Sequence, residues 1–103
     1  MAPNKYLKSQ PAQNVRLLNV LHALSDPVRL EIVLKLANEG EVPCRSFGFD
    51  LHKSSLSHHF MVLREAGMIA SRRKGRETVQ SIRKEDIEAQ FPGLLEAVIV
   101  AAR

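Results

Sequence analysis

Residues Lys53 to Ile69 read KSSLSHHFMVLREAGMI and are the most informative segment of the sequence. Leu56, Phe60 and Leu63 recur at helical spacing, so a helix over residues 53–66 is expected to turn this apolar face inward. Gly67 follows at the position where a helix ends in a positive φ, which glycine adopts at little cost. Serines and histidines line the opposite face, and a helix buried on all sides would have no need of them.

A basic hairpin is predicted directly after this helix. Residues 68–71 and 78–82 have strand character, and the letters RRKGR at residues 72–76 lead through the connecting turn. Residues 53–83 contain seven Lys and Arg against two acids, whereas residues 1–52 and 84–103 balance to +1 and −2. Positive charge concentrated on one segment is typical of a phosphate-binding surface, although a basic hairpin kept only for solubility is the plain alternative.

Two helices are expected before this stretch. Leucines recur at helical spacing over residues 14–24, and residues 27–38 are mostly apolar, which predicts a central, buried helix. Ser25 or Asp26 is expected to cap that second helix, with proline in its first turn and Gly40 at its end. Residues 41–52 are open: a short helix could begin at Pro43 and continue to Phe47. Core contacts are expected there from Phe47, Phe49 and Leu51.

The C-terminal residues predict a partner. A helix should begin at Lys84 and be interrupted by Phe91-Pro92-Gly93, after which residues 94–102 are almost wholly apolar. Such a helix should not lie exposed on a monomer, and a second copy of the chain is the simplest partner for it. The expected interface residues on the first and last helices are Leu17, Leu18, Leu21, Leu94, Leu95, Val98 and Ile99.

The predicted fold class is mainly α with a small β-hairpin, that is, α+β. The arrangement is a winged helix-turn-helix with N- and C-terminal dimerisation helices. A flexible arm over residues 1–12 is expected to precede one domain over residues 13–103. Within that domain the recognition helix covers about 53–66, the wing about 68–82 and the C-terminal dimerisation helix about 84–102.

Composition narrows the function. At 103 residues and 45% hydrophobic content, one domain with a modest core is expected. The few aromatic residues argue against a base-stacking platform for single-stranded nucleic acid. No apolar run is long enough to cross a bilayer and no leader is evident, so a cytoplasmic protein is expected. Without a cofactor motif or an acidic pair, neither an enzyme nor a cofactor is predicted.

Two motifs carry a resemblance to a known family. The segment LSDPVRLEI at residues 24–32 resembles the entry to the helix-turn-helix of ArsR-type (ArsR/SmtB-like) winged-helix repressors. Residues 57–69 resemble the recognition helix of that family, and residues 72–76 its wing; the similarity covers roughly residues 15–100. It implies a homodimer that binds a pseudo-palindromic DNA operator, represses transcription and is released by an inducer.

The metal ligands of many such repressors have no counterpart here. Many members carry a cysteine pair before the recognition helix, or acidic and histidine ligands on the last helix. The segment EVPCR at residues 41–45 holds one thiol, Cys44, and the last helix holds neither histidine nor cysteine. No metal site is therefore predicted, although Cys44 beside Arg45 remains a candidate redox switch. A small buried hydrophobic residue is the ordinary alternative for a lone cysteine.

The DNA-binding residues are expected on the recognition helix and the wing. Ser54, Ser57 and His58 should read base edges, and cations should meet phosphates or the minor groove. Alternative roles are helix capping for Ser54, core-edge packing for His59 and an ion pair with Glu65 for Arg64. The full set is Lys53, Ser54, Ser57, His58, His59, Arg64, Arg72, Arg73, Lys74 and Arg76. Two other functions remain on the same scaffold: a thiol- or metal-responsive sensor using Cys44, and a protein-interaction module that does not bind DNA.

Overall fold

The computed structural model describes residues 12–48 and 51–103. For residues 12–15 it describes the backbone alone. The predicted arm over residues 1–12 therefore lies outside the described residues except for Ala12, and so does the expected core contact of Phe49. The elements in chain order are α1 (Ala12–Leu24), α2 (Pro27–Glu39), β1 (Glu41–Pro43), a short 3-10 helix η2 (Cys44–Ser46), α3 (Lys53–Glu65), β2 (Ile69–Lys74), β3 (Glu77–Ile82), α4 (Lys84–Gln90) and α5 (Leu94–Ala101).

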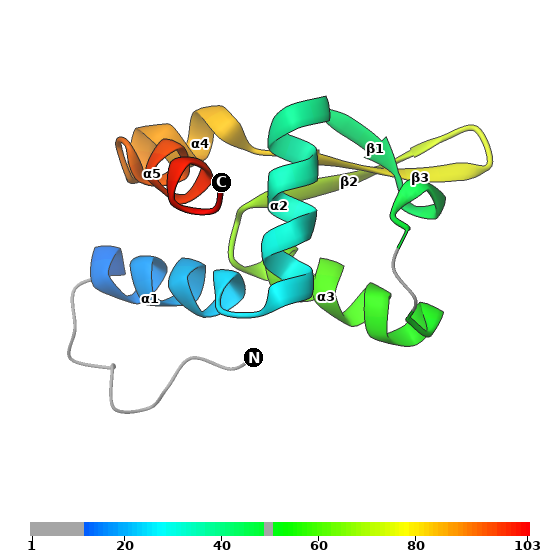
Figure 1. Ribbon diagram of the computed structural model, residues 1–103, viewed down its shortest axis with the longest axis horizontal. Coiled ribbons are helices and arrows are strands. Elements are labelled where there is room, and N and C mark those ends of the chain that lie inside the picture. Colours follow the sequence, from blue (N-terminus) through cyan, green and yellow to red (C-terminus); the bar gives the residue numbers. More distant parts are fainter. Residues whose placement is uncertain (1–11, 49–50) are drawn as a thin grey trace.

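The arrangement is a winged helix-turn-helix, as predicted (Figure 1). Helix α2 stands in the centre, α3 lies across its N-terminal end, and the β2–β3 hairpin extends away from the helices. Helices α4 and α5 lie at the end of the molecule opposite the hairpin tip. None of the helices within residues 12–48 and 51–103 is long and apolar enough to cross a membrane.

The corner between α1 and α2 is held by Asp26. Its carboxylate accepts hydrogen bonds from the backbone N–H groups of Val28 at 2.9 Å and Arg29 at 3.1 Å, which satisfies two amides that the first turn leaves unpaired. Pro27 occupies the first helical position, where its missing N–H costs nothing. Of the two predicted caps it is therefore Asp26 that acts, while the Ser25 hydroxyl donates to the carbonyl of His22.

The sheet has three antiparallel strands in the order β1-β3-β2, one more than the hairpin predicted. The short helix that the sequence left open between Pro43 and Phe47 is present as one 3-10 turn, η2, with Pro43 at its N-cap and Phe47 at its C-cap. Pro43 is also the last residue of β1. Proline fits there because an edge strand tolerates the loss of one N–H donor. Leu51, expected in the core, is 40% exposed, so that expectation is wrong.

The hairpin strands are longer than predicted. Lys74 pairs with Glu77, so only Gly75 and Arg76 form the turn, and Gly75 has a φ of 64°. A two-residue turn with glycine first and positive φ suits a type II′ hairpin, whose twist matches that of the strands. The ladder therefore includes the arginines, and the side chains of β2 alternate between the two faces of the sheet.

The hydrophobic core gathers around α2. Ile32, Val33 and Leu36 are completely buried, and the recognition helix α3 contributes Phe60 and Leu63, two of the residues expected to face inward. The ring of Phe47 packs edge-to-face on Phe60, with centroids 5.2 Å apart. This packing fixes which side of α3 faces solvent.

Candidate nucleic-acid interface

The exposed side of α3 carries the polar residues that the sequence assigned to DNA. Ser54, Ser57 and His58 are exposed, and Met61, 37% exposed, continues the same stripe one turn later. Lys53 is exposed at the first position of the helix. A helix that buries one face and presents hydroxyl and imidazole groups on the other has the width and chemistry to enter a major groove.

The start of α3 lacks a side-chain cap. His52 precedes the helix, and its side chain makes no capping hydrogen bond. The capping role considered for Ser54 is also not seen, because Ser54 lies inside the helix rather than at its N-cap position. Unpaired amides at a helix N-terminus attract anions, so this end of α3 is compatible with a phosphate.

His59 differs from the other predicted residues of α3. Its side chain is only 15% exposed, its Nδ1 atom lies 3.1 Å from Arg29 Nη1, and the same nitrogen lies 3.8 Å from Asp26 Oδ2. The ring of His58, one residue earlier, is 5.9 Å away and exposed. His59 thus occupies the core-edge position that the sequence analysis held open, and the partner that holds it, Arg29, was not predicted.

Arg64 connects α3 to the wing. Its Nη1 atom donates to the hydroxyl of Ser71 at 3.1 Å, and that hydroxyl donates to the side-chain carbonyl of Gln80. The amide nitrogen of Gln80, a residue only 1% exposed, donates to the sulfur of Cys44 at 3.0 Å. A chain of hydrogen bonds therefore runs from the recognition helix through β2 and β3 to η2, and the half-buried Cys44 is its last acceptor.

The basic residues of β2 are divided between the two faces of the sheet. Arg72 makes a bidentate ion pair with Glu41 of β1, with distances of 2.9 Å from Nε to Oε2 and 2.8 Å from Nη2 to Oε1. Lys74 lies 3.9 Å from the same carboxylate. Arg73 alternates to the side of Ser71, and its Nη1 atom lies 3.3 Å from the hydroxyl of Thr78.

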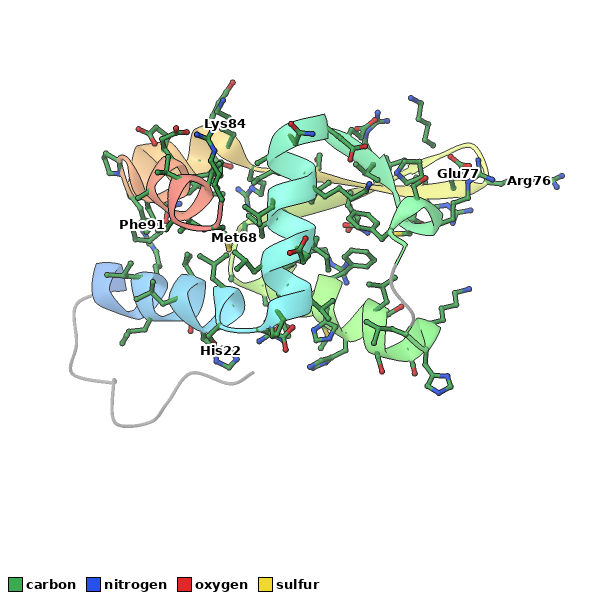
Figure 2. All side chains as sticks on the ribbon, viewed as in Figure 1. His22, Met68, Arg76, Glu77, Lys84 and Phe91 are labelled. Carbon is green, nitrogen blue, oxygen red and sulfur yellow. The ribbon has the colours of Figure 1, made fainter. Side chains whose placement is uncertain are left out.

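The contact with Arg72 lowers the pKa of the Glu41 carboxyl group. The hydrogen bond from Arg72 outweighs the opposing effect of desolvation, and it holds the pKa of Glu41 below its ordinary value, with help from the charges of Arg72 and Lys74. The same hydrogen bond raises the pKa of Arg72. Arg72 is thus charged but already partnered, whereas Arg73 and the turn residue Arg76 have no carboxylate partner among the ion pairs found in the described part of the chain. Figure 2 shows Arg76 extending outward from the hairpin tip.

A groove of about 650 Å³ lies between α3 and the wing. Its lining includes the apolar side chains of Phe47, Leu56 and Phe60 together with Ser57. The cations around it outnumber the single acid, Glu77, which forms an ion pair with Arg45. These basic residues are Arg45, Lys53, Arg64, Arg73 and Arg76. A concave surface with this charge, set between a polar helix face and a hairpin, can hold a phosphate backbone.

The residues predicted for a dimer interface fall into two groups. Leu18 and Leu21 of α1 are 41% and 44% exposed, and Leu17 and Val98 are partly exposed. Leu95 is 6% exposed and belongs to the core of its own chain, against which Leu94 and Ile99 also pack. The exposed apolar positions of α5 include Val100, at 52%, which the sequence analysis did not single out.

No group of three or more histidine, cysteine or acidic side chains close enough to hold one metal ion occurs within residues 12–48 and 51–103. The structure therefore offers no metal centre in the part of the chain that it describes.

Comparison with known proteins identifies the family. The family model described as "Bacterial regulatory protein, arsR family" matches residues 26–71, from the cap of α2 into β2. An uncharacterized HTH-type transcriptional regulator of Bacillus subtilis, YceK, is 37% identical over 82 residues, which cover 77% of this chain and 82% of that protein.

Two further relatives are described as repressors. The transcriptional repressor SdpR of Bacillus subtilis is 39% identical over 59 residues, covering 55% of this chain and 64% of its own length. The crystal structure of the transcriptional repressor BigR from Xylella fastidiosa superposes with a TM-score of 0.65 at 29% identity, covering 86% of this chain and 88% of that one. The chain belongs to the ArsR family of winged helix-turn-helix transcription regulators, which are not enzymes.

Proposed function

We propose that this protein is a homodimeric, sequence-specific DNA-binding repressor that a signal releases from its operator. The observation that carries the proposal is the shared location of the exposed face of α3 and the basic groove beside it. Ser54, Ser57 and His58 would meet base edges in the major groove, while Arg73 and Arg76 would meet phosphates or the adjacent minor groove.

A homodimer is supported by the exposed leucines of α1. It is also supported by the family to which the chain belongs, whose members usually form homodimers. A twofold axis would place the two α3 helices on one side of the duplex, with half-site centres about 34 Å apart, one helical turn of DNA. The names of SdpR and BigR support repression as the direction of regulation.

The experiment is a fluorescence anisotropy titration against a duplex from the promoter of its own gene and against an unrelated duplex, across a salt series. Arg73→Ala should weaken binding to both duplexes and reduce the slope of log K against log salt by about one. His58→Ala should weaken binding mainly to the promoter duplex, by roughly tenfold, which corresponds to about 1.4 kcal/mol.

Lys35→Ala is the matched control, because Lys35 lies on α2 in an i,i+4 ion pair with Glu39 and away from the groove. It should leave both affinities unchanged. A folded dimer that binds no duplex at any salt concentration contradicts the proposal and favours a protein-interaction module. Transcription from a reporter carrying the promoter should fall when the protein is expressed, and a rise would contradict repression.

A further inference from the structure

Arg29 joins three helices through one buried guanidinium group. It lies on α2, is 8% exposed, and donates from Nε to the carbonyl of Ala23 at 2.8 Å and from Nη2 to that of His22 at 3.4 Å. Its remaining nitrogen, Nη1, lies 3.1 Å from His59 Nδ1 on α3. The end of α1, the start of α2 and the middle of the recognition helix thus meet on one side chain.

The position suits a cation. The last carbonyls of α1 have no partners within their own helix, and a positive charge at a helix C-terminus is favourable. On the other side lies Asp26, whose carboxylate caps α2 and stands 3.8 Å from the same nitrogen of His59. Arg29 therefore pairs backbone acceptors of α1 with a side chain of α3 and holds both in fixed directions.

The contact also determines where His59 carries its proton. An arginine side chain only donates hydrogen bonds, so Nδ1 of His59 must accept from Arg29. In the neutral imidazole the proton is then on Nε2. Since successive residues on an α-helix point about 100° apart, a ring fixed at position 59 also fixes the direction in which His58 points.

We propose that Arg29 is a positioning residue that, through His59, sets the rotation of the recognition helix against α1. The proposal rests on the proposed function, in which α1 belongs to the dimer interface and α3 reads the operator. Under that function Arg29 links α1, which helps to fix the distance between the two recognition helices of the dimer, to α3, which contacts the bases of each half-site. Its loss should therefore reduce discrimination between DNA sequences more than it reduces attraction to phosphates.

The test uses the whole 103-residue chain with four variants and one control. Arg29→Met keeps the apolar stem and removes the donors, His59→Phe keeps the ring and removes the acceptor, and the double variant removes both. His59→Asn is the conservative replacement, because its side-chain oxygen can take the place of Nδ1. Lys35→Met is the matched control on the same helix, since Lys35 forms an i,i+4 ion pair with Glu39 of α2. For each protein we would measure the ratio of affinities for the promoter and unrelated duplexes, the free energy of unfolding, and the imidazole ¹⁵N shifts without DNA.

The expected result is a roughly tenfold fall in the affinity ratio for Arg29→Met and for His59→Phe, equivalent to losing one charge-assisted hydrogen bond. The double variant should lose no more than either single variant, because both remove the same contact. His59→Asn should recover most of the ratio, and Arg29→Met should shift the Nδ1 signal of His59 while leaving that of His58 in place.

Additive losses, or an unchanged ratio with only a loss of stability, overturn the positioning role. Where Arg29→Met fails to fold, His59→Phe and His59→Asn decide the question, because that side chain lies at the edge of the core. A wild-type protein that binds no duplex sinks the proposed function and the positioning role with it. The ¹⁵N shifts would still show separately whether Arg29 holds His59.

Discussion

Arg72 on β2 reaches across the central strand β3 to Glu41 on β1, and its Nε and Nη2 atoms donate to the two carboxylate oxygens at 2.9 Å and 2.8 Å. The pair ties the two outer strands of the sheet together and neutralises one of the basic residues of the wing. Glu41 thus competes with any phosphate for Arg72.

Replacing Glu41 by glutamine should release Arg72 for DNA. Binding to an unrelated duplex should strengthen, and the slope of log K against log salt should steepen by about one phosphate contact. Anisotropy across a salt series measures both, with Glu39→Gln on α2 as the control for the lost charge. An unchanged slope would mean that Arg72 does not reach the duplex even when it is free.

The pH dependence of the Glu41 contact has a definite sign. Because the folded pKa lies below the ordinary value of 4.5, the contact stabilises the folded protein above that pH and is lost as the pH falls through the lowered pKa. Thermal unfolding should be measured from about pH 3 to about pH 6, which brackets the ordinary glutamate pKa. The melting temperature should fall at the acid end of this range. Glu41→Gln should reduce that drop, and an identical acid limb in both proteins would contradict the pairing.

Asp26→Ala should destabilise the fold by about 1 kcal/mol, the usual cost of losing an N-cap, whereas Asp26→Asn should cost less. Burial opposes ionisation of this carboxylate, but hydrogen bonds from the Arg29 and Val28 amides and the charge of Arg29 together lower its pKa below 3.8. Its contribution should therefore persist above that pH and fade below it. Urea unfolding at pH 7 measures the cost, and equal losses for the two variants would argue against capping.

Gln80→Leu should cost about 1–3 kcal/mol, because the substitution keeps the volume but leaves the Ser71 hydroxyl and the Cys44 sulfur without their buried amide partner. Equilibrium unfolding in urea provides the measurement. Asn38→Leu, at an exposed position of α2, is the control for adding an apolar side chain and should be close to neutral. A neutral Gln80→Leu would show that the hydrogen-bond chain contributes nothing to stability.

Leu21→Glu should convert the proposed dimer to a monomer, because it places a charge on an exposed apolar position of α1 that a partner would cover. Sedimentation velocity distinguishes the two states. Leu51→Glu is a matched control: its leucine is 40% exposed but lies beside the groove rather than on α1, so the dimer should persist. A Leu21→Glu protein that remains dimeric would remove α1 from the interface.

The fold could be predicted where the signal is local. The 3.6-residue spacing along α2 and α3, the cap at Asp26 and the glycines after α2 and α3 are written within a few residues of where they act, and the structure confirms them. Strand β1 could not be predicted in this way. Its three residues include a proline, and its extended conformation depends on pairing with Val79, Gln80 and Ser81, far along the chain.

The candidate site shows the same limit. Helical periodicity placed Ser54, Ser57 and His58 on the exposed face of α3, and the structure finds them exposed. Helical periodicity could not predict the buried position of Arg29, because an arginine on an apolar helix is normally expected to face solvent. Its burial depends on the carbonyls of His22 and Ala23 at the end of α1, which accept hydrogen bonds from its guanidinium group across the corner at Asp26.

The two-residue turn at Gly75 and Arg76 has a consequence for the adjacent arginines of β2. Arg72 and Arg73 are chemically identical, and only the parity of their positions along the strand separates a residue tied to Glu41 from one that faces the groove. One residue added at the turn would shift the register of β2 by one position, so that Arg72 and Arg73 would exchange faces of the sheet. One residue inserted between Ile69 and Arg72 would leave both arginines on their present faces, because it would displace only the residues before it. The length of this turn therefore encodes which arginine is available to a ligand, and it does so without changing the composition or charge of the wing.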